Sequence, residues 1–151
     1  SSDLAARNQH VETVLQPALA NKQFILCDRF LDSTYVYQSI VGGISKDLVD
    51  KISLPVLHNV VPDLTFVFYC ELKIANERMQ AQTHRTLDRL DSFTNSIHEK
   101  IALGYKEIYD KKYPYPNGIL PTRVFVDASQ SVQDIFSFLK QEIENKLGLS
   151  L

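Results

Sequence analysis

The sequence predicts an α/β fold built around a parallel β-sheet. Three apolar runs without internal turn residues indicate buried strands, at residues 24–27, 64–70 and 123–127. Amphipathic segments lie between and after these runs, and an alternation of strands and helices is typical of a three-layer α/β domain. The length of 151 residues fits a single domain over residues 1–151.

The helices follow from apolar residues that recur at every third or fourth position. They are predicted at residues 4–19, 35–40, 46–57, 73–82, 92–112 and 131–147. The polar residues 1–3 are suited to cap the first helix, and Pro17 is expected to kink it or end it early. Gly42 ends the second helix and Gly148 ends the last one.

Composition excludes several classes of protein. The net charge of -2 provides no electrostatic basis for binding nucleic acid or an anionic membrane, and no apolar stretch approaches the ~20 residues that span a bilayer. The two cysteines, Cys27 and Cys70, lie in apolar runs and are expected to act as small hydrophobic residues, which favours a reducing, cytoplasmic location. The four histidines have no second ligand at metal-binding spacing.

Charged and polar side chains follow the strand at residues 24–27. Open α/β sheets bind ligands at this carboxyl end of their strands. Asp28 and Arg29 place a carboxylate beside a guanidinium that can grip phosphate oxygens, while Ser33, Thr34 and Gln38 offer neutral hydrogen-bonding groups. The set indicates a site for a phosphorylated ligand with a hydrogen-bonding ring. A surface ion pair followed by an ordinary helix cap is the alternative for the first two residues.

The string at residues 28–38 resembles the Asp-Arg-Tyr-x-x-Ser-x-x-Ala-Tyr-Gln segment of thymidylate kinases. Residues 5–19 resemble that family's acceptor-site helix, with an arginine at the place of Arg7. Residues 62–68 resemble its fourth strand, residues 87–91 its lid, and residues 126–129 its adenine-side loop. These motifs occur in the family's order and cover nearly the whole chain.

The resemblance implies a P-loop nucleoside monophosphate kinase fold and phosphoryl transfer from ATP to thymidine 5′-monophosphate (dTMP), giving dTDP, with Mg²⁺ as counter-ion. It implies that Arg29 holds the dTMP phosphate, and that Arg7 contacts the thymine edge or the phosphate. Thr34 and Gln38 would complete recognition of the base, and Ser33 would also belong to the substrate-binding site. Tyr37 would pack near the sugar.

The resemblance also implies the remaining site residues. Asp28 would lie near the magnesium shell, acting on the metal through water. A lid at about residues 83–92 would bring Arg89 and Arg85 to the donor phosphates, joined by Arg78. The resemblance implies that the adenine-side loop lies beside adenine, with Ala128, Ser129 and Gln130. The family commonly forms homodimers through helices, including the one that residues 4–19 match.

Two departures from the family pattern carry expectations. Thymidylate kinases open with a strand that leads into a Gly-rich phosphate loop ending in Gly-Lys-Ser/Thr. Neither that strand nor that loop is found in this chain. We therefore expect a C-terminal portion of a longer protein, inactive by itself. Asp3 stands four residues before Arg7, where the family usually has a phenylalanine that stacks on thymine, so base stacking is expected to be lost if residue 3 is native.

Two other functions remain open at this stage. The first is a kinase for another nucleoside monophosphate or for a deoxynucleoside, which the same motifs would serve. The second is a non-catalytic nucleotide-binding or dimerisation module, which the missing phosphate loop suggests.

Overall fold

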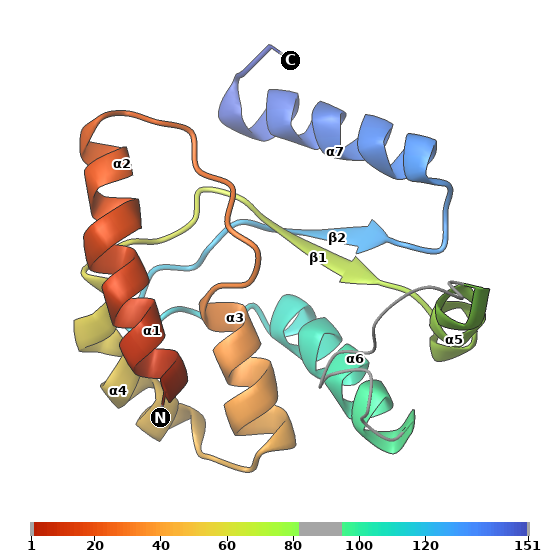
Figure 1. Cartoon of the computed structure of the whole chain (residues 1–151), viewed down its shortest axis with the longest axis horizontal. Coiled ribbons are helices and arrows are strands. Elements are labelled where there is room, and N and C mark those ends of the chain that lie inside the picture. The colour runs from red at the N-terminus through yellow and green to blue at the C-terminus, as the bar shows by residue number, and fades with distance from the viewer. Residues whose placement is uncertain (1, 82–94, 151) are drawn as a thin grey trace. The chain divides into compact units, whose positions relative to one another are not determined.

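The computed structural model describes residues 2–81 and 95–150, and its helices with a parallel sheet confirm the α/β class (Figure 1). The chain divides into two compact units. The first comprises Ser1–Pro62 and Lys112–Pro121, and the second comprises Asp63–Lys111 and Thr122–Leu151. The single domain over residues 1–151 stays a prediction.

A nearly unbroken helical stretch opens the first unit. It consists of α1 (Ser2–His10), the π-helical η1 (Val11–Leu15) and α2 (Gln16–Ala20). Pro17 has no N–H to donate and its ring crowds the preceding turn, so an ordinary α-helix would break there. The turn before it is instead widened, with the Gln16 N–H donating to the Val11 carbonyl oxygen. The helix thereby continues past the proline.

Two further helical segments complete the helices of the first unit. The short α3 (Leu31–Thr34) runs directly into the π-helical η2 (Tyr35–Val41), which ends at Gly42 as predicted. The next helix, α4, spans Lys46–Leu57 as predicted, and the Ser45 hydroxyl caps it by accepting a hydrogen bond from the Leu48 N–H at 3.3 Å.

The core of the first unit lies between these helices and the connector at residues 112–121. Its aromatic members are Phe30, Tyr35 and Tyr115. The last two are 0% and 2% exposed, and their ring centroids lie 6.5 Å apart. The buried aliphatic members are Val11, Leu15, Leu31, Val36, Val49 and Leu57. Each such side chain stabilises the fold by roughly 1.5–3 kcal/mol through removal from water.

The strand predicted at residues 24–27 is wrong. These residues have no regular secondary structure, and Phe24 and Leu26 are 61% and 85% exposed. A strand is stabilised by ladder bonds and by cover on its faces, and no described residue pairs with this run. Cys27 is also exposed, contrary to its expected role as a buried residue, and Cys70 is partly buried.

The second unit contains a two-stranded parallel sheet. Its strands are β1 (Thr65–Tyr69) and β2 (Arg123–Asp127), with Val67 opposite Phe125. The helices are α5 (Leu72–Ala81), α6 (Asn95–Asp110) and α7 (Val132–Leu147). Figure 1 shows α6 and α7 on opposite sides of the sheet, as a three-layer arrangement requires.

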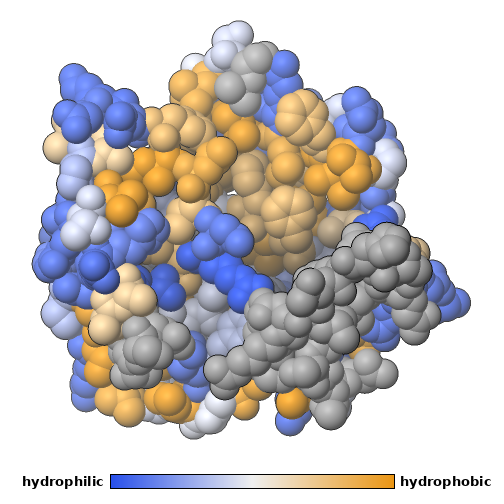
Figure 2. Space-filling view, in the orientation of Figure 1, coloured by the Kyte–Doolittle hydropathy of each residue, from blue (hydrophilic) through white to orange (hydrophobic). Residues whose placement is uncertain are grey.

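The core of the second unit is small. Val67, Val126 and Ile108 are at most 4% exposed, whereas α7 has no buried residue. Val132 and Phe136 of this helix are 83% and 64% exposed, and Figure 2 shows apolar side chains at the surface where α7 lies. The apolar stripe that predicts this helix is therefore only partly covered by the described residues.

Candidate functional site

Arg7 and Thr34, predicted from separate segments of the sequence, meet in the first unit. The Arg7 guanidinium donates to the Thr34 hydroxyl oxygen at 2.8 Å, across 27 residues of sequence. The guanidinium carbon also lies 5.4 Å from the centroid of the Phe30 ring, close enough for a cation–π interaction. Thr34 and Phe30 are buried, at 7% and 9% exposure, so the guanidinium is held against a fixed surface.

Arg29 has an unusual backbone conformation. Its φ angle is +64°, in the left-handed region that residues with a Cβ rarely adopt. Such a conformation costs on the order of 1–3 kcal/mol and persists where the surroundings require it, often at functional sites. The exposed guanidinium lies 5.7 Å from the centroid of the Tyr37 ring, and Asp28 beside it is also exposed.

The remaining predicted acceptor-side residues lie on the same helical segment as Thr34. Ser33 precedes it in α3, and Gln38 follows it in η2; both side chains are partly buried. The Gln38 carbonyl oxygen accepts a hydrogen bond from the Ile44 N–H at 3.0 Å, which ties the end of η2 to the loop after it. The structure thus brings Arg7 to Thr34 and Arg29 to Tyr37, and it carries Ser33 and Gln38 alongside. We call Arg7, Phe30 and Thr34, together with Arg29 and Tyr37, the acceptor cluster.

Sequence reasoning missed Phe30 as a member of this cluster. The only signal for it is a bulky aromatic residue directly after Arg29. Its ring packs on the Tyr115 ring, with centroids 6.4 Å apart, as well as beneath Arg7. Because Tyr115 lies in the distant connector at residues 112–121, local sequence could not reveal this support.

Arg78 has a defined role in the second unit. One of its amino groups donates to the Ala128 carbonyl oxygen, and the other donates to the carbonyl oxygens of Ser129 at 2.8 Å and Gln130 at 3.2 Å. A planar guanidinium with several N–H donors suits such a row of acceptors. The predicted adenine-side loop, Ala128 to Gln130, is therefore shaped by Arg78, and we call it the donor loop.

Asp127 supports the donor loop from the end of β2. Its carboxylate accepts hydrogen bonds from the Ser129 hydroxyl at 2.6 Å and the Ser129 N–H at 2.9 Å. These bonds stabilise the charged form and hold the pKa of the Asp127 carboxyl below its usual range. Loop and strand end are thus joined by charge-assisted hydrogen bonds.

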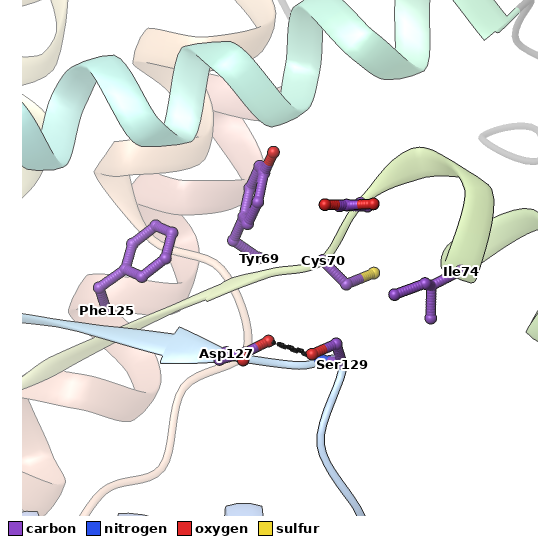
Figure 3. A pocket seen from close by; sticks show the side chains of 7 residues that line it. Tyr69, Cys70, Ile74, Phe125, Asp127 and Ser129 are labelled. Carbon is purple, nitrogen blue, oxygen red and sulfur yellow. Dashed lines mark hydrogen bonds between the residues drawn. The ribbon is translucent and has the colours of Figure 1, made fainter.

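A pocket of about 340 Å³ opens beside the donor loop, at the carboxyl ends of both strands (Figure 3). In Figure 3 the Tyr69 and Phe125 rings lie on one side of it, while Cys70 faces Ile74 on the other. The residues that line it are Tyr69, Cys70, Glu71, Ile74, Phe125, Asp127 and Ser129. This is the sheet edge at which parallel α/β proteins bind ligands.

Some predicted site residues lie outside the described part of the chain. Arg85, Arg89 and the lid at about residues 83–92 fall within residues 82–94, which the structure does not describe. Within residues 2–81 and 95–150, no three metal-ligating side chains gather into a metal site. No helix in that same part of the chain has the length and apolar character needed to cross a membrane.

Comparison with known proteins places the chain in a family. The family model described as thymidylate kinase matches residues 4–137. The chain is 32% identical over 145 residues to the thymidylate kinase of Mycoplasma capricolum, and 34% identical over 144 residues to that of Shouchella clausii. In both cases the match covers 95% of this chain and 64% of the relative, so the chain spans slightly less than two thirds of their length.

A solved structure shares the fold. The crystal structure of thymidylate kinase from Ehrlichia chaffeensis superposes with a TM-score of 0.59 at 22% sequence identity, covering 95% of this chain and 62% of that one. Together with the family model and the relatives above 30% identity, the motifs and the geometry lead to one conclusion. The chain belongs to the thymidylate kinase family.

Proposed function

We propose that the natural protein containing this chain transfers the γ-phosphoryl group of ATP to dTMP, giving dTDP. The proposal assigns recognition of dTMP to the acceptor cluster and recognition of adenine to the donor loop. The observation that carries the proposal is the hydrogen bond between Arg7 and Thr34. It joins two motifs, at residues 5–19 and 28–38, that the resemblance expects to contact the same nucleotide.

Arg29 would hold the phosphate of dTMP through paired hydrogen bonds, which a guanidinium makes in a fixed fork. Its left-handed backbone is consistent with this role, since backbone strain is concentrated at active sites. Arg7, fixed against Phe30, would contact the thymine edge or the phosphate. The acceptor would thus face two cations from different segments.

The helical segment from α3 to η2 would recognise the rest of the nucleotide. Thr34 and Gln38 carry groups that can hydrogen-bond a base edge, and Ser33 lies beside them. Tyr37 would pack near the sugar, with its ring already engaged by Arg29. Binding by several oriented groups suits a reaction that depends on positioning more than on covalent catalysis.

On the donor side, the loop at Ala128, Ser129 and Gln130 would lie beside adenine. Arg78 supports this assignment by holding the loop's carbonyl oxygens, and a direct contact of Arg78 with the donor phosphates stays a prediction. From the lid, Arg89 and Arg85 would approach the transferred group, where cations neutralise the charge that develops on its oxygens.

Mg²⁺ would be bound chiefly by the donor phosphates and water. Kinases commonly hold this ion through one or two carboxylates and the substrate phosphates, without an all-protein cage. Asp28 fits that pattern as a single exposed carboxylate next to Arg29, acting through water. The ion would offset phosphate charge, while the arginines of this chain would orient the two nucleotides.

The donor phosphates also need a phosphate-binding loop, which these 151 residues do not contain. We propose that this loop lies in sequence beyond the present chain and that the 151 residues alone are inactive. The relatives support this view, since the chain spans 64% of their length. We further propose a cytoplasmic homodimer that uses the α1 to α2 helix, where Val14 and Leu19 are 51% and 47% exposed.

The test is an ADP-release assay with ATP, Mg²⁺ and dTMP, accompanied by the intact mass of the same sample. We expect turnover from a sample whose mass exceeds that of these 151 residues, and none from the 151 residues alone. Preference for dUMP or thymidine over dTMP would favour the alternative substrates. Binding of dTMP without turnover in the longer protein would favour a non-catalytic module, and light scattering would report the dimer.

A further inference from the structure

A polar network lies behind the acceptor cluster in the first unit. Tyr35 is fully buried in η2, and its hydroxyl donates to the Asp50 carboxylate of α4 at 2.6 Å. The other oxygen of that carboxylate is 2.6 Å from the Lys46 ammonium, one helical turn earlier. A single carboxylate therefore joins two helical segments through charge-assisted hydrogen bonds.

Aromatic rings from the connector at residues 112–121 close the network. The Lys46 ammonium lies 4.9 Å from the centroid of the Tyr35 ring and 5.7 Å from that of Tyr113, within cation–π range of both. The Tyr35 and Tyr113 rings meet edge to face at 6.1 Å. Three separate segments are thus tied together at Tyr35.

Tyr35 immediately follows Thr34, whose hydroxyl accepts the Arg7 hydrogen bond. Successive helical residues point about 100° apart, so the fixed Tyr35 side chain sets the direction in which Thr34 points. The π-helical turn of η2 adds a second constraint, because this rare hydrogen-bond pattern competes with an ordinary α-helix. Relaxation to an α-helix would shift Tyr37 and Gln38 relative to Thr34.

We propose that Asp50 is a positioning residue for acceptor recognition. By holding the Tyr35 hydroxyl, Asp50 fixes the rotation and register of the helical segment that presents Thr34, Tyr37 and Gln38 to the nucleotide. Asp50 acts through Tyr35 and touches no substrate. The inference rests on the proposed dTMP-binding function and deepens it.

The experiment uses the longest natural chain that contains these residues, with dTMP and ATP affinities measured by calorimetry and turnover by ADP release. Tyr35→Phe removes the hydroxyl and keeps the buried ring, so the variant retains its packing. Asp50→Asn removes the charge shared with Lys46. We expect each to raise the Kd and KM for dTMP by about three- to tenfold, as residues remote from a ligand do, with ATP binding and kcat within about twofold.

The chain offers a matched control in α6. Lys106 and Asp110 form the same kind of pair, four residues apart at 2.5 Å, but they are 48% and 51% exposed against 29% and 23% for Lys46 and Asp50. Asp110→Asn should leave dTMP affinity unchanged. The double variant of Tyr35 and Asp50 should lose no more affinity for dTMP than the weaker-binding single variant. Both substitutions break the same hydrogen bond, so their effects should not add.

Other outcomes overturn the inference. A fall in kcat or in folded fraction at unchanged dTMP Kd would assign Asp50 a purely structural role. Unchanged affinity in both variants would show that the network does not act on the site. If the unsubstituted protein fails to bind dTMP at all, the proposed function itself fails, which the wild-type titration reveals before any variant is examined.

Discussion

Arg7 and Arg78 come from helices of different units, and the sequence predicts a nucleotide contact for each. In the structure Arg7 donates to a side chain, Thr34, and lies over the Phe30 ring. Arg78 instead donates its hydrogen bonds to backbone carbonyl oxygens of the donor loop. The same residue type therefore contacts side chains in the acceptor cluster and backbone carbonyl oxygens in the second unit, and the difference comes from what lies opposite each guanidinium.

The largest effect should come from Arg29, the cation of the acceptor cluster whose exposed guanidinium lies 5.7 Å from the centroid of the Tyr37 ring. Arg29→Ala should lower kcat/KM for dTMP by well over tenfold, since charge-assisted hydrogen bonds contribute about 1.5–3 kcal/mol. Steady-state kinetics would measure this. Arg29→Lys keeps the charge without the fork and should recover only part of the loss.

Lys22 provides a matched control for Arg29. It is an exposed cation with a left-handed φ of +55°, so Lys22→Ala reproduces both the lost charge and the backbone context. We expect unchanged kinetics for this control. Equal losses at both positions would indicate a general electrostatic effect, and unchanged efficiency in Arg29→Ala would remove Arg29 from the site.

Arg78→Met tests the other side of the comparison. Losing several hydrogen bonds to the donor loop should raise KM for ATP by about tenfold, because each bond to a charged donor is worth about 1.5–3 kcal/mol and the loop can partly relax. KM for dTMP should stay constant. Lys73→Met, an exposed cation on the same helix, is the control. A rise in KM for dTMP instead would contradict the assignment of Arg78 to the donor loop.

Arg7→Met should show the reverse selectivity. We expect KM for dTMP to rise about fivefold with KM for ATP unchanged, since a hydrogen bond and a cation–π contact are lost on the acceptor side only. Thr34→Val removes the acceptor of the same hydrogen bond. If Arg7 and Thr34 contacted different ligands, the losses in the two variants would add in the double variant instead of overlapping.

A smaller effect is expected at Gly42, which follows η2. A Cβ atom there would lie 2.8 Å from the Gln38 carbonyl oxygen and 2.9 Å from that of Tyr37, so the backbone of η2 would have to shift. Gly42→Ala should weaken dTMP binding by about threefold, because it would displace Tyr37 and Gln38, which are proposed to contact the nucleotide. Titration calorimetry would measure the affinity.

A variant at Gly43 distinguishes the effect of backbone displacement in η2 from the effect of a general loss of stability. Its φ is +76° and nothing lies within 4 Å of a Cβ there, so Gly43→Ala introduces strain without pushing on η2. We expect it to lower the Tm while leaving dTMP affinity unchanged. If both glycine variants weakened dTMP binding equally, general destabilisation would explain the effect.

The two units should also differ in their response to pH. Burial, with the hydrogen bond to Asp50, raises the pKa of Tyr35 above its ordinary value of about 10. Its contribution to stability is therefore complete below pH 10 and is lost as the pH rises further, because the unfolded phenol ionises first. The lowered pKa of Asp127 has the opposite effect on stability. The contribution of Asp127 to the free energy of unfolding is present above about pH 3.8 and is lost on acidification.

Urea unfolding as a function of pH would measure both trends. Tyr35→Phe should lose less stability than the wild type between pH 10 and 11, and Asp127→Asn should lose less below pH 4. Neither substitution should alter the pH dependence at the opposite end. Parallel curves for all proteins at both ends would contradict the two assignments.

Much of the fold could be predicted because its signals are local. The helices at Lys46–Leu57 and Val132–Leu147 were predicted at the observed bounds or one residue away, since Ser45, Ser131 and Gly148 cap them through nearby backbone groups. The strand at Arg123–Asp127 was predicted correctly for a different reason, because its partner β1 is present to pair with it. The run at residues 24–27 has a similar apolar pattern and forms no strand, because no described residue supplies its ladder.

The candidate site divides in the same way. The sequence alone determined which residues are candidates for the site, because the order of motifs around Arg7, Arg29 and Thr34 requires only residue type and spacing. Only the tertiary structure decided what each side chain contacts. Arg7 lies over the Phe30 ring, Arg78 donates to the donor loop, and Tyr35 donates to Asp50. These contacts join segments that lie up to 52 residues apart along the chain. Their geometry depends on how the helices pack, and packing is a property of the whole folded unit that no local pattern encodes.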